Sequence, residues 1–140
     1  MPENQPIKVI IDTNLWVSFL IGKKLAGLEK LIVDRSLQVI FCDQILEEIT
    51  LVTQRPKLQK YFSTAKVKEL IELLNTIGLS IEITSEVSVC RDAKDNYLLA
   101  LAKDSQSHFL ITGDKDLLSL MNFESTEIST YQDFLDKIKI

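Results

Sequence analysis

The sequence has few of the residues that mark special classes of protein. Its 140 residues include four glycines and three prolines, which excludes collagen-like and low-complexity chains. The most apolar stretch, residues 9–21, is interrupted by Asp12 and Asn14, so we expect no membrane-spanning segment. The first residues lack the basic segment of a signal peptide, and we therefore expect a cytoplasmic protein.

Cysteine and histidine are also too scarce for several kinds of site. Cys42 and Cys90 stand far apart without a CxxC partner, so neither a disulfide framework nor a zinc site is indicated. His108 is the only histidine, which argues against an imidazole zinc site and against a Ser–His–Asp triad, and no GxSxG turn is present. Walker A and GxGxxG loops are absent as well.

Positive charge is not in excess. Sixteen basic and twenty acidic residues give a net charge of −4, which argues against binding nucleic acid through bulk positive charge. The hydrophobic fraction of 46% and the charged fraction of 26% are those of an ordinary globular protein. The length fits one domain, which we expect to cover residues 1–140.

Strand-like and helix-like segments alternate along the chain. We expect strands at residues 8–11, 38–42, 79–83, 109–112 and near 127–128. We expect helices at residues 15–21, 25–34, 43–54, 63–77, 94–104, from 116 and from 132. This alternation predicts an α/β sandwich around a mostly parallel sheet.

Acidic residues follow two of the buried strands directly. Asp12 follows the first strand, Asp114 follows the strand at 109–112, and Asp116 comes two residues later. Because ligands bind at the carboxyl ends of strands in an open parallel sheet, these acids are candidates for a binding site. Each could instead cap the helix that follows it.

Helical periodicity distinguishes two neighbouring glutamates. The stripe expected to face inward in the helix after Asp43 consists of Ile45, Ile49 and Val52. At about 100° per residue, Glu48 lies beside this stripe, whereas Glu47 points to solvent. Glu48 is therefore the better candidate for a site.

The same periodicity places Asp95 on the buried stripe of its helix, three and four residues before Leu98 and Leu99. A buried carboxylate costs several kcal/mol unless it is paired or metal-bound, although a helix cap or a dipole partner remains an alternative. Clustered carboxylates without matching basic residues repel one another. Such oxygen-only groups suit Mg²⁺ or Mn²⁺.

These motifs, in this order, resemble those of PIN domains. The resemblance rests on VIIDTN at residues 9–14, LEEI at 46–49, RDAKDN at 91–96 and TGDKDLL at 112–118, and it covers residues 8 to about 120. The chain is most similar to the branch of toxin components of toxin–antitoxin systems related to VapC-type toxins, which RPKL at 55–58 and CRD at 90–92 also fit. The resemblance implies a three-layer α/β/α sandwich with about five strands, frequent homodimers and metal-dependent RNA cleavage.

The resemblance also implies roles for individual residues. Asp12, Asp95 and Asp114 would hold Mg²⁺ or Mn²⁺, and Glu48 and Asp116 would complete the site directly or through water. Asn14 and Thr112 would orient the carboxylates. Asp92 competes with Asp95 as a ligand. The metal would polarise the phosphodiester and lower the pKa of a bound water.

Other residues are candidates for contacts with partners. Arg55 and Lys57 could contact RNA phosphates at the rim of the site, with a solvated helix face as the alternative. A cognate antitoxin could place an Arg or Lys side chain in the acidic cleft. The helix at residues 15–21 is apolar almost all round, so we expect it to be covered, for example by a second copy of the chain.

Two other classes of protein remain as alternatives. A phospho-receiver also has an acidic pocket at the carboxyl edge of its sheet, but residues 79–84 offer no acceptor aspartate and residues 127–130 no lysine. A PIN fold kept only for binding would retain the architecture without cleavage. Without the five candidate acids the chain would carry fifteen acidic and sixteen basic residues, so its net negative charge comes from the predicted site.

Overall fold

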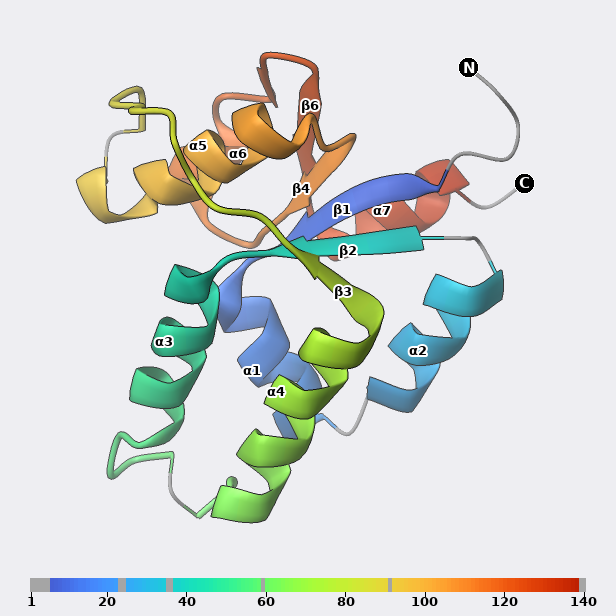
Figure 1. Cartoon of the computed structure of the whole chain (residues 1–140), viewed down its shortest axis with the longest axis vertical. Helices are drawn as coiled ribbons and strands as arrows, with labels where there is room; N and C mark the ends of the chain where they lie inside the picture. The colour runs from blue at the N-terminus through green and yellow to red at the C-terminus, as the bar shows by residue number, and fades with distance from the viewer. Residues whose placement is uncertain (1–5, 23–24, 35–36, 59, 91, 139–140) are drawn as a thin grey trace.

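The computed structural model describes residues 6–22, 25–34, 37–58, 60–90 and 92–138, and it has helices on both sides of one sheet (Figure 1). The strands are β1 (Ile7–Ile11), β2 (Leu37–Phe41), β3 (Gly78–Ser80), β4 (Phe109–Ile111), β5 (Asn122–Phe123) and β6 (Thr126–Ser129). The α-helices are α1 (Thr13–Ile21), α2 (Leu25–Asp34), α3 (Asp43–Thr53), α4 (Thr64–Ile77), α5 (Asn96–Ser105), α6 (Lys115–Leu118) and α7 (Tyr131–Ile138). A 3₁₀ turn, η1 (Ala93–Asp95), leads into α5.

The order of the strands creates a reversal point in the middle of the sheet. The spatial order is β3-β2-β1-β4-β6-β5, and all neighbours are parallel except β5 and β6. From β1 the chain moves outward to β2 and β3, and then returns past β1 to β4. Because right-handed crossovers change face when the direction reverses, α1 to α4 cover one face, and α5 and α6 cover the other. The carboxyl ends of β1 and β4 therefore flank the position where such sheets bind ligands.

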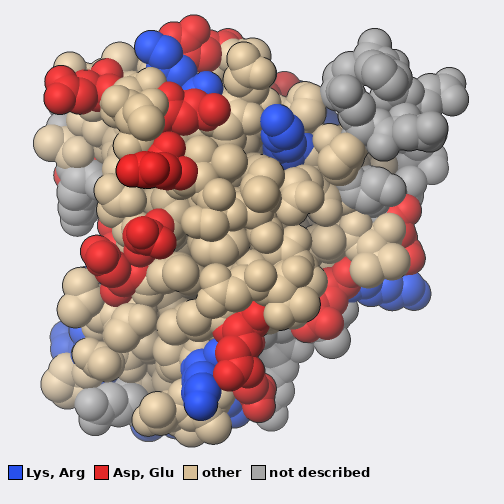
Figure 2. Space-filling view, in the orientation of Figure 1, with Lys and Arg blue, Asp and Glu red and all other residues tan. Residues whose placement is uncertain are grey.

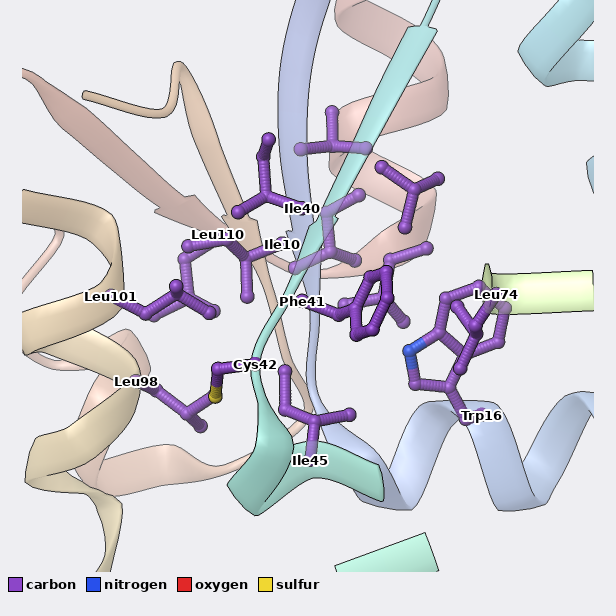
Figure 3. Packing of buried hydrophobic residues seen from close by; sticks show 14 of the residues in the cluster. Ile10, Trp16, Ile40, Phe41, Cys42, Ile45, Leu74, Leu98, Leu101 and Leu110 are labelled. Carbon is purple, nitrogen blue, oxygen red and sulfur yellow. The ribbon is translucent and has the colours of Figure 1, made fainter. Parts of the chain in front are cut away.

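Alternation along the strands divides the core between the two faces. Leu98 and Leu101 of α5 pack toward Leu110 of β4, while Trp16 of α1 and Leu74 of α4 lie on the other side (Figure 3). All five side chains are fully buried. Each such side chain contributes roughly 1.5–3 kcal/mol through removal of apolar surface from water. This packing fixes the strand ends from which the candidate acids project.

The predicted α/β architecture is confirmed, but the sheet has six strands rather than five. The additional strand, β5, has only two residues, and it is flanked by tight turns at Met121 (φ 63°) and Glu124 (φ 53°). Two residues are too few to show a periodicity of two, which explains why no sequence pattern indicated this strand.

The strand predicted at residues 79–83 is shorter in the structure. β3 ends at Ser80, and its last link to the sheet is the bond from the Ile81 N–H to the Phe41 carbonyl, 2.9 Å long. Residues 82–88 still alternate between exposed and half-buried, so their pattern resembles a strand, although they are not part of any strand that the structure describes. In α3, Cys42 occupies the N-cap position and Asp43 is the first helical residue.

Helix α1 is covered by its own chain. Trp16, Val17, Phe19 and Leu20 are buried, and the Phe19 ring meets the ring of Tyr131 at a centroid distance of 5.0 Å. Its apolar character is therefore explained without a second copy, and the homodimer stays a prediction. None of the helices in the described ranges has the length and apolar character needed to cross a membrane.

One carboxylate holds the segment between β3 and α5 in place. Asp104 of α5 accepts hydrogen bonds from the backbone N–H groups of Thr84 (2.6 Å) and Ser85 (3.0 Å), and also from the Ser85 hydroxyl. These bonds to the charged form lower the pKa of Asp104 to about 2. The contact ties residues 84 and 85 to the last turn of α5.

We predict that Asp104→Ala lowers the melting temperature by about 4 °C at pH 7, because an exposed set of charge-assisted bonds contributes about 1 kcal/mol. The pKa of Asp104 lies below its ordinary value of 3.8 in the folded protein, so the contribution is present above about pH 4 and is lost as the pH falls toward 2. Thermal melts across this range measure the effect. Glu86→Gln on the same segment is the matched control, and an equal loss in both variants would contradict the assignment.

Candidate active site

Asp12 is placed by the pairing of β1 with β4. Its backbone N–H donates to the Ile111 carbonyl (3.0 Å), which extends the ladder one residue beyond the two strands. Asp12 occupies the N-cap position of α1 but makes no side-chain capping bond. Its Oδ2 instead accepts a hydrogen bond of 2.7 Å from the hydroxyl of the fully buried Thr112. Burial raises the pKa of Asp12, whose side chain is 6% exposed.

Asp114 begins the short helix α6 at the end of the neighbouring strand. Its Oδ1 accepts from the backbone N–H groups of Asp116 (2.7 Å) and Leu117 (3.2 Å), so the capping interpretation is correct for one of its two oxygens. The Asp114 N–H donates to the Thr112 hydroxyl oxygen (3.0 Å). The Thr112 side chain therefore links Asp12 and Asp114, and the Asp114 charge further raises the pKa of Asp12.

Asp95 joins this pair from α5 on the other face of the sheet. It stands at the N-cap position of α5 without capping it. Its Oδ2 is buried and has no hydrogen-bond partner among the described residues. Burial, followed by the nearby charges of Asp114, Asp12 and Asp92, raises the pKa of Asp95 to about 7. Three carboxylates from three elements thus lie within electrostatic reach of one another.

The loop before Asp95 is fixed by contacts that the sequence analysis did not single out. The Asn96 side-chain oxygen accepts from the Cys90 N–H (2.7 Å), and the Asp95 N–H donates to the Asp92 carbonyl (3.0 Å). Asp92 therefore supports the turn through its backbone as well as lying near Asp95. Cys90 is buried, and its thiol lies close enough for the charges of Asp95, Asp114 and Asp116 to raise its pKa beyond the effect of burial.

Glu48 approaches the group from α3. It is half-buried and Glu47 is exposed, so the expected difference in burial is confirmed. The hydroxyl of Tyr97, a residue that the sequence analysis missed, lies near Glu48 and Thr13. The only sequence signal for Tyr97 is that the hydroxyl of a tyrosine in a buried helix needs a polar partner.

The other predicted residues are arranged less closely. The side chain of Asn14 is exposed, and its backbone N–H lies close enough to Asp12 to lower the Asp12 pKa without making a capping bond. Asp116 is half-buried in the first turn of α6. Arg55 and Lys57 are exposed in the turn after α3, at the end of that helix away from the sheet (Figure 1). The structure does not bring these two basic residues into the carboxylate group.

The surrounding surface has the same sign of charge as the site. Acidic side chains run down the side of the molecule that carries α5 and the amino-terminal end of α3, where Lys and Arg side chains are few (Figure 2). As they stand, the described His, Cys, Asp and Glu side chains form no group of three or more that could hold a metal ion. The three aspartates nevertheless lie at one edge of the sheet, close enough for their charges to interact.

The chain matches a known protein family over most of its length. The model of the PIN domain family matches residues 8–116, which include all the candidate acids. The chain belongs to the PIN domain family. It is 34% identical over 121 residues to the uncharacterized protein MJ1680 of Methanocaldococcus jannaschii, which covers 84% of this chain and 77% of that protein.

A solved PIN domain has the same fold. The structure of the PIN domain of human SMG5 superposes with a TM-score of 0.50 at 12% identity, covering 94% of this PIN domain and 99% of that chain. PIN domains are generally nucleases, so the family places the carboxylate group in a nuclease fold.

We predict that Asp95→Asn raises the melting temperature in EDTA at pH 8. The raised pKa means that the folded protein holds the Asp95 proton more tightly than the unfolded chain does, so the free energy of unfolding falls as the pH rises from about 3.8 to about 7. The amide cannot ionise, and the advantage of the variant should disappear near pH 4. A clearly lower melting temperature for the variant at pH 8 would make Asp95 a structural cap instead.

Proposed function

We propose that this PIN domain is a metal-dependent endoribonuclease that hydrolyses RNA phosphodiester bonds. The observation that carries the proposal is the convergence of Asp12, Asp95 and Asp114, with a buried Asp95 oxygen that has no partner among the described residues. If Asp95 were only a helix cap or half of a structural ion pair, this oxygen would have a partner in the structure. A ligand that binds carboxylate oxygens would supply the partner instead.

The donor set fits Mg²⁺ or Mn²⁺. These hard cations prefer carboxylate oxygens, and the three aspartates supply only oxygen. Because like charges repel when no cation lies between them, the side chains need a counter-charge before they can close on one centre. The Asp95 Oδ2 atom would break no hydrogen bond to a described residue on binding a cation.

The chain's own residues would prepare the site in separate ways. Asp12, Asp95 and Asp114 would hold the metal, with Glu48 and Asp116 beside them. When bound, the metal would supply Lewis acidity and a water of lowered pKa. Thr112 fixes the Asp12 carboxylate and the Asp114 backbone through its single hydroxyl. Asp114 keeps one oxygen on the α6 cap, which holds its other oxygen in a defined direction.

We propose that Arg55 and Lys57 contact the RNA backbone away from the reacting phosphate. Both are exposed, and they follow Glu48 by seven and nine residues. They lie in the turn beyond the end of α3 at Thr53, so they would contact phosphates other than the one that is cleaved.

We predict that the purified protein cleaves single-stranded or loop RNA only with Mg²⁺ or Mn²⁺, and that Asp12→Asn reduces the rate by at least a hundredfold. The amide keeps the shape of the side chain but removes the charge that a metal needs. Gel analysis of a pool of cellular RNAs in Mg²⁺, in Mn²⁺ and in EDTA measures this. Cleavage that persists in EDTA would eliminate the metal mechanism.

Glu47 and Glu48 provide a matched pair of controls on one helix. Glu48→Gln should slow cleavage, whereas Glu47→Gln should leave it unchanged because Glu47 is exposed. Equal losses in the two variants would show that the charge of α3, rather than the position of Glu48, matters. A protein that cleaves no RNA in any metal would be a PIN fold kept for binding.

We further propose that this ribonuclease is the toxin of a toxin–antitoxin pair. The support is the sequence resemblance to VapC-type toxins together with the acidic character of the site. A cognate antitoxin could place an Arg or Lys side chain among the carboxylates, supply the missing counter-charge and displace the metal. Free carboxylates favour such a partner for the reason that they favour a cation.

This role predicts that expression of the parent protein arrests growth of a bacterial host, whereas expression of Asp12→Asn does not. The difference follows from RNA cleavage and not from the presence of the folded protein. Growth curves and immunoblots at matched protein levels measure it. If the parent cleaves RNA in vitro but leaves growth unchanged, the ribonuclease stands and the toxin role fails.

A further inference from the structure

Two buried hydroxyl groups at the edge of the carboxylate group lack partners. The Thr13 Oγ1 and the Tyr97 hydroxyl are both buried, and neither makes a hydrogen bond of good geometry to a described residue, although the two side chains lie within reach of each other. Thr13 is 1% exposed, and it lies in the first turn of α1 next to Asp12. Buried hydroxyls without partners are rare because their desolvation is not compensated. Because this pair lies beside the predicted site, we consider which hydrogen bonds its members could make there.

The surroundings of the Tyr97 hydroxyl show what it faces. Thr13, Glu48 and Asp12 are the polar groups close enough to change the pKa of Tyr97, which burial raises strongly. The ring itself packs against the hydrophobic core, so it cannot swing freely to solvent. The hydroxyl is therefore fixed between α3, which carries Glu48, and the start of α1, which follows Asp12.

The two hydroxyl groups have more hydrogen-bonding capacity than they can use on each other. The two hydroxyls can satisfy each other with a single bond, in which one donates and the other accepts. One O–H donor then remains, and the carboxylates within reach are those of Glu48 and Asp12. Glu48 lies within hydrogen-bonding reach of the Tyr97 hydroxyl, whereas Asp12 acts on it through its charge alone, so Glu48 is the acceptor. Catalytic hydrogen bonds that are long in a free enzyme commonly tighten in the loaded state.

We propose that Tyr97, supported by Thr13, is a positioning residue that directs the Glu48 carboxylate toward Asp12, Asp95 and Asp114. The Tyr97 hydroxyl donates to Glu48 and keeps that carboxylate directed toward the place where the three aspartates would hold a cation. Thr13 donates to the Tyr97 oxygen and completes the chain of bonds. This inference rests on the proposed metal-dependent function and names the residues that bring the fourth acid into it.

The test uses the purified full chain and variants that remove one hydroxyl each. Tyr97→Phe keeps the packed ring, and Thr13→Val is nearly isosteric. Tyr131→Phe is the matched control, because Tyr131 is another half-buried tyrosine whose ring packs on Phe19. Thr13→Ser keeps a hydroxyl and should restore the behaviour of the parent.

Three measurements separate positioning from structure. In EDTA, the melting temperature of Tyr97→Phe should equal or exceed that of the parent, because the variant no longer buries an unpartnered hydroxyl. The dissociation constant for Mn²⁺, measured by electron paramagnetic resonance, should rise about tenfold. The kcat for RNA cleavage should fall about tenfold with KM unchanged, since the RNA contacts are intact. Tyr131→Phe should change none of the three.

A double variant identifies the group through which Tyr97 acts. Combining Tyr97→Phe with Glu48→Gln should be no worse than Glu48→Gln alone, because the hydroxyl then has no carboxylate to direct. Multiplied losses would overturn the inference, as would a lower melting temperature in EDTA with unchanged Mn²⁺ affinity. If the parent binds Mn²⁺ and cleaves RNA but Tyr97→Phe matches it, only the inference fails. A parent that does neither overturns the proposed function and the inference together.

Discussion

The pairing of β1 with β4 is the constraint on which the candidate site depends. The bond from the Asp12 N–H to the Ile111 carbonyl extends this pairing just past the two strands, and so brings Asp12 beside Thr112. The Thr112 hydroxyl can then donate to Asp12 and accept from the Asp114 N–H. A slip of one residue would turn Thr112 to the opposite face of the sheet and break both bonds. The register of two short buried strands thus sets the geometry of two acids.

At Asp95 the packing of the hydrophobic core stabilises an arrangement that is electrostatically unfavourable. The apolar stripe of α5, with Leu98 and Leu101, anchors the helix against the sheet, and this anchoring brings Asp95 to Asp12 and Asp114. The packing that stabilises the fold therefore assembles a group of like charges, whose repulsion and burial are unfavourable. Because the apolar stripe contributes several kcal/mol, it outweighs one partly ionised carboxyl group. The fold can hold the acids together before any ligand compensates them.

The sequence predicted those parts of the fold and site that depend on local periodicity. The burial difference between Glu47 and Glu48 and the inward position of Asp95 both follow from 100° per residue, and the structure agrees. Asp12 and Asp114 could be anticipated because acids after parallel strands meet at one edge. The roles of these residues in chemistry remain predictions.

Contacts between distant segments could not be predicted in this way. Asp104 binds the backbone at residues 84 and 85, twenty residues away, and no pattern in either segment indicates the other. The proximity of the Tyr97 hydroxyl to Thr13, which is more than eighty residues away in the chain, could not be predicted either. β5 is too short to show a period, while residues 82 and 83 continue the period of a strand beyond the last residue that bonds to β2. Periodicity predicts which face of a segment is buried, but tertiary packing determines which other segments contact that face.

The distribution of charge links the site to the way in which such a domain could meet RNA. The five candidate acids account for the excess negative charge, and the remaining acidic and basic residues nearly balance. Outside its five candidate acids the domain therefore has almost no net charge to attract a phosphate backbone, and the surface around the site is acidic. Under the proposed function, attraction of the reacting phosphate then depends on a cation held by the carboxylates, while Arg55 and Lys57 add contacts at a distance. A domain of this kind releases few counterions from RNA, so its affinity should vary less with monovalent salt than that of a basic nucleic-acid-binding protein.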